Sequence, residues 1–445
     1  MSPKPTRPRP SIARNTAFDS VAQGAIMVFS LFAGVVLARS LGDEGRGEYV
    51  IATSFAGMLL LGLTNMGVEL SASVMVARDR RLLPRLHTLI VALGLGMGAA
   101  VGATAWVFRD FFLGTLMPGL SGPGLALLVA ALPFWIYQTG CYGLLVGMGR
   151  IRARAGFDVA FNLVQNLLVV LLIVIVPRSE VVFALILAYY ATIVFSCVHL
   201  GMIVRGRRRR LWAMPDAGLA REFLRYGFAV YIGNMGSTLG QRIDQYFVQQ
   251  VGRDAGAFGV YTLATSLTAR TRVFPQALSR SSYARLCAAP APEAARLAAA
   301  CFRQMLALGA ILLIVGAACS PLIPIIYSAD FAPAVVPFLI FLLGRLFHNA
   351  AWMLANFFSG HLARPDIPMW INWGILPVQA VAAYFAMKLG GLVAVALITS
   401  AGYALLFAVF VVMFLRWQEH VGARELFLLG RADLEPWLRL LKRKK

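Results

Sequence analysis

The sequence predicts an all-α integral membrane protein of about twelve membrane-spanning helices, arranged as two parallel lobes of six. Three observations predict this fold. Apolar runs of about twenty residues recur from one end of the chain to the other. The 445 residues are 59% hydrophobic and only 14% charged, with a mean hydropathy of +0.73, whereas soluble proteins carry roughly 25% charged residues. Basic residues are concentrated in alternate loops.

Each predicted span is long enough to cross roughly 30 Å of hydrocarbon as a helix. In chain order the spans are 16–38, 49–70, 88–107, 124–148, 156–176, 181–204, 226–251, 256–278, 302–327, 333–357, 368–387 and 391–415. The first run is longer than the apolar core of a signal peptide and lacks a small-x-small cleavage site. We therefore expect it to remain in the mature chain as the first span.

The distribution of Lys and Arg predicts the orientation. Of the 41 basic residues, 33 fall in one set of alternate loops and in the two ends of the chain, six fall in the other loops, and Arg242 and Arg345 lie within spans. The positive-inside rule therefore places the N- and C-termini of a multi-pass protein in the cytoplasm. The net charge of +21 would suggest nucleic acid in a soluble protein, but this distribution predicts membrane lipids as partners and no nucleic acid.

A strongly basic connection, which contains Arg207–Arg210, divides the chain into two sets of six spans. The predicted parts are a cytoplasmic N-terminal arm (1–15), an N-lobe (16–204), a basic cytoplasmic linker (205–222), a C-lobe (223–415) and a basic amphipathic tail (416–445). The tail mixes apolar and basic residues, which favours an interfacial helix on anionic lipid. A recruitment site for a cytoplasmic partner is the alternative.

The two halves share a weak internal repeat. The pattern Tyr-x-x-Ala-Thr-Ser occurs at 49–54, after the first span, and again at 261–266, after the seventh, and Gly42 pairs with Gly252. Because an even number of spans separates the copies, the repeats run parallel. We therefore expect the substrate path between the two lobes.

Charged and polar residues within spans are expensive in lipid and are candidate site residues. In the tenth span Arg345, His348, Asn349 and Asn356 share one helix face, which is typical of a helix that lines a cavity. The structural alternative is an Arg345 buried against a carboxylate of the adjoining helix, with the amides in interhelical hydrogen bonds.

Two other spans carry polar faces. In the seventh span Asn234 and Gln241 lie on one face and are flanked by Arg242 and Asp244, which point apart because they are two residues apart on a helix. For each of these two residues, the sequence is compatible with a structural bridge to a neighbouring helix and with a contact to the substrate. In the fifth span Asn162 and Asn166 share a face.

Several features argue against an enzyme. The sequence contains no phosphate-binding loop, no HExxH, no G-x-S-x-G and no paired-cysteine zinc spacing, so no catalytic or metal site is predicted. The outer loops are too short for a catalytic domain. The small-xxx-small spacing of Gly94 and Gly98, and of Gly143 and Gly147, indicates helix packing.

Motifs in a fixed order carry a family resemblance. They are Ala38–Gly42 with Gly47–Tyr49, then Arg242–Gln245, Gly256–Tyr261 and Phe274–Ser279. With the twelve-span layout, these segments resemble the polysaccharide-export branch of the multidrug/oligosaccharidyl-lipid/polysaccharide (MOP) transporter superfamily, the group of O-antigen and exopolysaccharide flippases.

The resemblance implies a fold like that of the multidrug (MATE) transporters, with a cationic central cavity between two lobes. It implies a flippase of the bacterial inner membrane, without a cofactor, that moves polyprenyl-pyrophosphate-linked oligosaccharide units by alternating access for lipopolysaccharide or exopolysaccharide synthesis. The coupling ion would be H+ or Na+, and other polysaccharide assembly proteins are candidate partners. Family roles carry over to Arg242, Asp244 and Arg270. Val28 and Gly34 stand where lipid II flippases have arginines, so a peptidoglycan role is not expected.

Three alternatives remain open at this point. A major facilitator also has two parallel six-span halves, but its glycine-bearing loop after the second span is missing. A drug/cation antiporter of the same superfamily would need acidic residues in its cavity, whereas the charged residues within the spans are mostly basic. An integral membrane glycan polymerase or ligase would usually carry a sizeable periplasmic loop.

Overall fold

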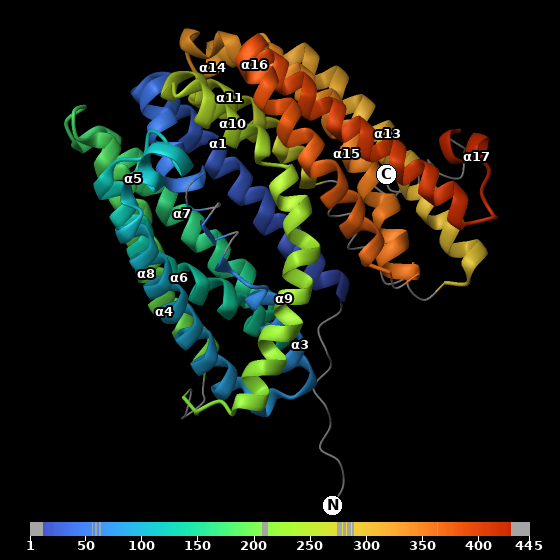
Figure 1. Cartoon of the computed structure of the whole chain (residues 1–445), viewed down its shortest axis with the longest axis horizontal. Coiled ribbons are helices and arrows are strands. Elements are labelled where there is room, and N and C mark those ends of the chain that lie inside the picture. Colours follow the sequence, from blue (N-terminus) through green and yellow to red (C-terminus); the bar gives the residue numbers. More distant parts are fainter. Residues whose placement is uncertain are drawn as a thin grey trace, which may run out of the picture. The chain divides into compact units, whose positions relative to one another are not determined.

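The computed structural model describes residues 12–428 apart from a few short gaps, and every regular element among them is a helix (Figure 1). The gaps fall at 56, 58–59, 62–63, 207–211, 274–277, 279–281, 283–285, 287–288 and 363. Eight of the described helices are long and apolar enough to cross a membrane, and the longest of them holds two of the predicted spans. The predicted all-α membrane fold is confirmed.

The chain separates into two compact units. Unit 1 comprises Met1–Ser40, Ile51–Gly114 and Leu120–Tyr231, and unit 2 comprises Leu41–Val50, Thr115–Gly119 and Ile232–Lys445. The predicted limits of the two lobes remain predictions. Most of the predicted N-terminal arm, the Arg207–Arg210 run and the tail beyond residue 428 lie outside the described residues.

Unit 1 is built around α6. Its helices are the first part of α1 (Ile12–Val50), η1 (Ile51–Phe55), α3 (Val68–Arg78), η2 (Arg80–Leu82), α4 (Leu83–Val107), α5 (Arg109–Phe111), η3 (Phe112–Leu116), α6 (Gly122–Gly147), α7 (Ile151–Ile175), α8 (Val181–Arg205) and the start of α9 (Ala217–Gly240). Helices α3, α4 and α8 pack against α6. A Cβ at Gly143 would lie 2.0 Å from the Glu69 carbonyl oxygen, and one at Gly147 would lie 2.3 Å from that of Ser73. These glycines therefore allow close helix packing, as their spacing predicts.

Unit 2 is built around α15. It contains the end of α9, α10 (Ile243–Gly252), α11 (Ala255–Ala269), η4 (Arg270–Arg272), α13 (Ala291–Cys319), α14 (Leu322–Ile326), η5 (Ala329–Ala334), α15 (Val335–Asn356), η6 (Phe357–His361), α16 (Asp366–Trp417) and α17 (Ala423–Phe427). Helix α15 packs against α11, α13 and α16. Phe302, Phe358, Phe410 and Phe414 form the centre of its apolar core. Leu426 of α17 is fully buried in the same core, so the start of the tail belongs to unit 2.

Several predicted spans differ from the helices observed. The second, predicted as 49–70, is interrupted at Asn65–Gly67 before α3 begins. The seventh span, predicted as one helix, is broken at Gln241–Arg242 between α9 and α10. The ninth begins eleven residues earlier than its predicted start at residue 302, because the alanine-rich segment at the start of α13 is helical and buried. In α16 a left-handed Gly391 (φ 63°) interrupts the helix and separates the eleventh span from the twelfth.

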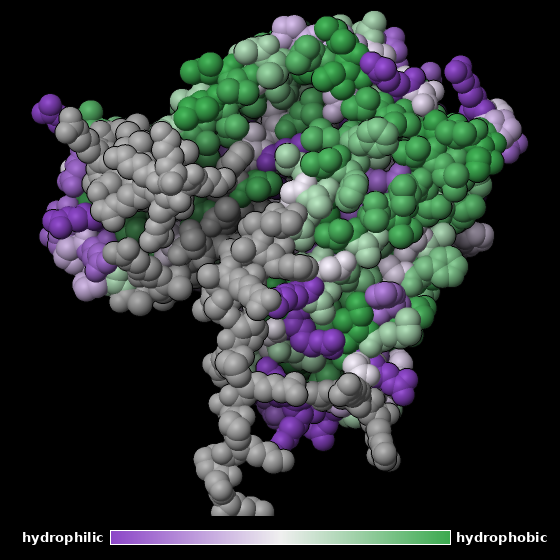
Figure 2. All heavy atoms as spheres, turned by 180° about the vertical axis from the view of Figure 1, so that it is seen from behind, coloured by the Kyte–Doolittle hydropathy of each residue, from purple (hydrophilic) through white to green (hydrophobic). Residues whose placement is uncertain are grey.

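The surface of the helices suits lipid rather than water. Hydrophobic side chains cover broad areas of the face shown in Figure 2. Val164, Leu167, Leu171 and Val174 of α7 are all exposed. Contiguous apolar surface of this size would be costly in water but is matched by hydrocarbon. The chain is a multi-pass membrane protein.

Candidate functional site

Four charged side chains meet inside unit 2, and we call Arg242, Asp244, Arg272 and Arg345 the arginine cluster. The helix break positions the first of them: α9 ends at Gly240, and Arg242 is the N-cap residue of α10. Asp244 lies in the first turn of α10, Arg272 lies in η4 directly after α11, and Arg345 lies midway along α15. Three separate segments therefore supply the positive charges.

Arg345 is the most deeply placed of the three arginines. Its side chain is only 6% exposed, and its guanidinium carbon lies 5.2 Å from the centre of the Tyr403 ring. Its Nε and Nη1 atoms have no hydrogen-bond partner among the described residues. A buried guanidinium group with unpaired donors carries a large desolvation cost, so this side chain is arranged for a partner other than these residues.

The other two arginines add to this positive charge. All three guanidinium groups lie close enough to Tyr403 to interact with it electrostatically, and Arg272 also interacts unfavourably with Arg242 and Arg345. Arg242 donates from Nη1 to Gln245 Oε1 at 2.9 Å. Like charges gathered in a poorly hydrated interior repel each other, and a bound anion would relieve that repulsion.

Asp244 is the one carboxylate of the cluster. It is 2% exposed, and its Oδ2 atom accepts a hydrogen bond from the Tyr261 hydroxyl at 2.8 Å. Among the described residues its Oδ1 atom has no hydrogen-bond partner, and no guanidinium nitrogen of these residues lies within 4.0 Å of the carboxylate. Arg242 and Asp244 therefore do not form an ion pair, which agrees with their two-residue spacing. Positive charges outnumber the negative charge three to one.

Neutral polar groups of α15 adjoin the cluster. The His348 ring lies 4.7 Å from the Tyr403 ring, centre to centre, and Asn349 donates from Nδ2 to the Thr271 hydroxyl at 3.4 Å. His348 Nδ1 and Asn349 Oδ1 are buried without a hydrogen-bond partner in the described residues. The predicted polar face of this helix therefore lies inside unit 2, against η4 and α16.

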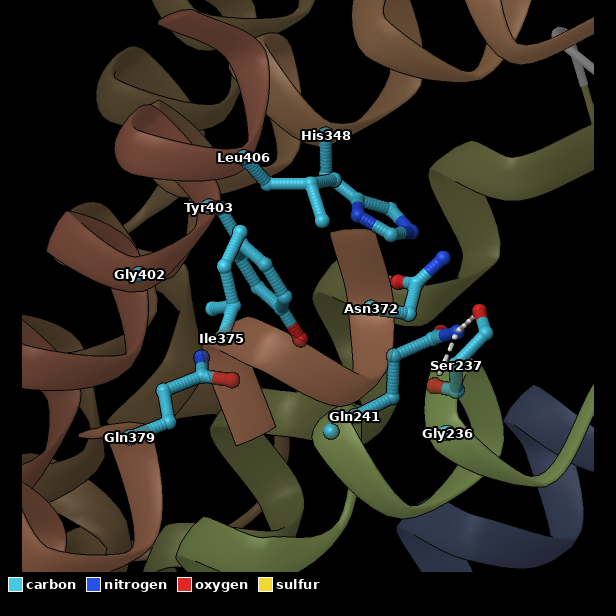
Figure 3. Close-up of a pocket in the computed structure, with 11 residues that line it drawn as sticks. Gly236, Ser237, Gln241, His348, Asn372, Ile375, Gln379, Gly402, Tyr403 and Leu406 are labelled. Atoms are coloured by element: carbon cyan, nitrogen blue, oxygen red, sulfur yellow. Dashed lines mark hydrogen bonds between the residues drawn. The ribbon is translucent and has the colours of Figure 1, made fainter. Parts of the chain in front are cut away.

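A pocket lies beside Tyr403 and His348 (Figure 3). The end of α9 lines it, together with His348 of α15 and with the parts of α16 before and after Gly391. Its lining consists of Gly236, Ser237, Gly240, Gln241, His348, Asn372, Ile375, Gln379, Gly402, Tyr403 and Leu406. The lining is polar but holds no Asp, Glu, Lys or Arg. We call it the amide pocket.

The remaining predicted residues lie outside the arginine cluster. Arg270 interacts electrostatically with Tyr327, and Asn356 ends α15 as a partly buried side chain. Asn162 and Asn166 belong to α7 of unit 1, where each donates to the carbonyl oxygen four residues earlier, at 2.9 and 2.7 Å. The side chain of Asn234 lies outside the described residues.

Three members of this site are not among the residues predicted from the sequence. Arg272 is one of the 33 basic residues assigned to the cytoplasmic side, although it also falls within the predicted eighth span, 256–278. Tyr261 and Tyr403 belong to apolar helices and follow no polar periodicity, so no local pattern singles them out.

The cluster suits an anion better than a metal ion. In the described part of the chain, no three His, Cys, Asp or Glu residues come together as a metal site would require. Guanidinium groups offer planar pairs of N–H donors, which match phosphate and carboxylate oxygens.

Comparison with known proteins agrees with the fold. The inward-facing structure of a multidrug resistance MATE family transporter of the MOP superfamily matches with a TM-score of 0.70 and 15% identity, over 88% of this chain and 94% of that one. The lipid II flippase MurJ in an inward closed conformation matches with a TM-score of 0.65 and 14% identity, over 89% and 87%. A MOP superfamily transporter from Pyrococcus furiosus matches with a TM-score of 0.60 and 14% identity, over 91% and 95%.

The sequence matches no curated protein. A family model described as "Polysaccharide biosynthesis protein" matches residues 12–274, which is more than half of the chain. The MOP fold of its structural neighbours and the family match agree with the resemblance in the motifs. The chain therefore belongs to the polysaccharide biosynthesis protein family and has the fold of the MOP transporters.

Proposed function

We propose that the protein is a flippase that moves polyprenyl-pyrophosphate-linked oligosaccharide units across the bacterial inner membrane by alternating access. The units would serve the synthesis of O-antigen or exopolysaccharide. Family membership and the MOP-type transporter fold support the broader part of this proposal. The arginine cluster is the observation that carries the choice of substrate.

A lipid-linked glycan presents the anion that the arginine cluster lacks. Pyrophosphate spreads its negative charge over several oxygens, and each guanidinium group can donate two parallel hydrogen bonds to such a group. Arg345 offers two buried donors without partners among the described residues. The bound anion would turn three mutually repelling charges into a neutralised site, and the binding energy would come from relief of that repulsion.

The same charges argue against a drug/cation antiporter. A cationic substrate in contact with three guanidinium groups would be repelled, and Asp244 alone cannot offset them.

A polymerase or ligase would form a glycosidic bond, and its product would be larger than its substrate. Translocation leaves the lipid-linked unit chemically unchanged, and this difference separates the two classes experimentally.

The direct test is complementation of a deletion strain that accumulates lipid-linked repeat units. Wild type, Arg345→Ala, Arg242→Ala and the control Arg178→Ala are compared at equal protein level. The control removes an exposed arginine of unit 1. We expect surface polysaccharide to return with wild type and the control, and to stay low with the two cluster variants.

Two results would overturn the proposal. If wild type leaves the accumulated lipid-linked units unchanged, the protein does not translocate them. If wild type instead converts them into longer lipid-linked chains in isolated membranes, the protein is a polymerase.

We further propose that both termini face the cytoplasm, because 33 of the 41 basic residues lie in the chain ends and the loops on the same predicted side. Single cysteines at Glu419, near the C-terminus, and at Arg178, in a loop predicted on the other side, provide the test. A membrane-impermeant maleimide should label only the second in intact cells. Labelling at Glu419 would contradict the orientation.

A further inference from the structure

The amide pocket lies next to the arginine cluster and shares two residues with its surroundings. Tyr403 lines the pocket, and its ring also lies 5.2 Å from the Arg345 guanidinium carbon. His348 lines the pocket and interacts electrostatically with Arg345 and Arg272. A ligand that fills both places must therefore carry a neutral polar group directly beside an anionic group.

The lining of the pocket offers both donors and acceptors of hydrogen bonds. Gln241, Asn372 and Gln379 contribute carboxamide groups, and Tyr403 contributes a hydroxyl that points into the space between them in Figure 3. Such groups recognise hydroxyl and amide groups rather than ions. Ile375 and Leu406 add an apolar wall, against which the C–H groups of a ligand can pack.

Two polar atoms at the pocket have no partner in the described residues. Gln241 donates from Nε2 to the Ser237 carbonyl oxygen and hydroxyl at 3.1 and 3.3 Å, while its Oε1 atom is buried and unpaired. His348 Nδ1 is buried and unpaired as well. Because buried polar groups in native proteins are almost always satisfied, these atoms indicate a missing polar partner.

The size of the pocket limits what can enter it. The cavity between the lining side chains has a volume of about 20 Å³, measured as the space open to the centre of a water molecule. That interior holds about one water molecule, so it can take one polar substituent of a larger ligand but not a whole sugar ring. Gly402 makes room for the Gln379 side chain, because a Cβ at position 402 would lie 2.4 Å from Gln379 Nε2.

We propose that the amide pocket binds a hydroxyl substituent of the sugar that is joined to the pyrophosphate. This inference rests on the proposed function. In a glycosyl pyrophosphate one oxygen atom joins the phosphorus to the sugar, so the first ring lies directly beside the charge. The arginine cluster thus binds the pyrophosphate, which all such lipids share, and the amide pocket recognises the first sugar.

The test measures binding of two kinds of ligand to the full-length protein in nanodiscs of phosphatidylethanolamine and phosphatidylglycerol. One ligand is farnesyl pyrophosphate, and the others are a panel of farnesyl-pyrophosphoryl monosaccharides. The variants are Gln241→Met and Gln379→Met, which keep the volume of the side chain and remove its amide. Gln138→Met, which removes a buried amide of unit 1 that donates to Ser196, is the matched control.

We expect wild type and the control to bind at least one sugar-bearing ligand more tightly than farnesyl pyrophosphate. Each pocket variant should lose about tenfold in affinity for that ligand and change less than about twofold for farnesyl pyrophosphate. Arg345→Ala should lower the affinity for both kinds of ligand. Retention of the sugar preference in both pocket variants would overturn the inference and leave the flippase proposal standing. If wild type binds none of the pyrophosphates, the proposed function fails instead.

Discussion

The two units each hold a group of charged side chains, and the groups differ in how the charges are satisfied. In unit 1 Arg154 Nη1 lies 3.0 Å from Glu69 Oε1, and Arg154 Nε lies 3.9 Å from Asp158 Oδ2. The guanidinium carbon of Arg154 lies 4.9 Å from the centre of the Tyr142 ring. We call these four residues the Arg154 network. The arginine cluster of unit 2 holds three guanidinium groups and one carboxylate, which form no ion pair with one another among the described residues.

The difference separates a structural role from a binding role. The Arg154 network has one positive charge for two carboxylates, and its three charged side chains are between 18% and 40% exposed, so water hydrates them. Arg345 and Asp244 are 6% and 2% exposed. A fold gains little from buried charged groups without an ion-pair partner, so the presence of this cluster is best explained by a ligand that it binds.

The largest effect on ligand binding is expected at Arg345. Arg345→Ala should reduce the affinity for farnesyl pyrophosphate by about 30-fold or more, because a buried charge-assisted contact to the anion is lost. Arg345→Lys should recover part of it. Isothermal titration of the protein in nanodiscs measures both values, and an unchanged affinity in the alanine variant would remove Arg345 from the binding site.

The next effect concerns stability. Asp244→Asn leaves Arg242 and Arg345 without the carboxylate that they interact with, and should lower the free energy of unfolding by about 2–4 kcal/mol. Asp158→Asn is the same chemical change in the Arg154 network and should cost no more than about 1 kcal/mol. Denaturant unfolding compares the two variants. Added inorganic pyrophosphate should stabilise Asp244→Asn more than Asp158→Asn, and equal stabilisation would contradict the assignment of the anion site.

A smaller effect is expected within the Arg154 network itself. A double-mutant cycle between Glu69→Ala and Arg154→Ala should give a coupling free energy of at most about 1 kcal/mol, because both groups are about a third exposed. Transport by the two single variants should remain within about threefold of wild type. A loss of transport comparable to that of Arg345→Ala would show that the network has a role in the substrate path.

The smallest effect is expected at Arg364. Its Nη2 atom lies 2.7 Å from Asp366 Oδ2 in a pair with both side chains exposed. Solvent screens such a pair, so Arg364→Ala should change neither the melting temperature nor the transport rate measurably. A clear loss of stability would mean that its position over the Trp417 ring, at 5.2 Å, contributes more than its charge.

The sequence was sufficient for the membrane fold, because that fold follows from the length and composition of its apolar runs. It also placed Arg345, His348 and Asn349 on one helix face, since spacings of three and four residues fix the face of a helix. These three residues are all buried in unit 2.

Partners contributed by distant segments could not be predicted in the same way. Tyr403 lies 58 residues beyond Arg345, and its position depends on how α16 packs against α15. The break at Gln241–Arg242 lies inside a continuous polar pattern, so the periodicity of the seventh span predicted one helix and missed the N-cap position of Arg242. Tertiary packing, rather than local pattern, decides both features.

The most direct measurement is translocation by the purified protein in proteoliposomes, followed with a fluorescent polyprenyl-pyrophosphate-linked oligosaccharide that a membrane-impermeant reagent quenches on one side. Wild type and Arg154→Ala should move the lipid at similar rates, while Arg345→Ala should be slower by about 30-fold or more. Equal rates for wild type and Arg345→Ala would contradict the account, because the buried arginine cluster would then have no part in carrying the pyrophosphate.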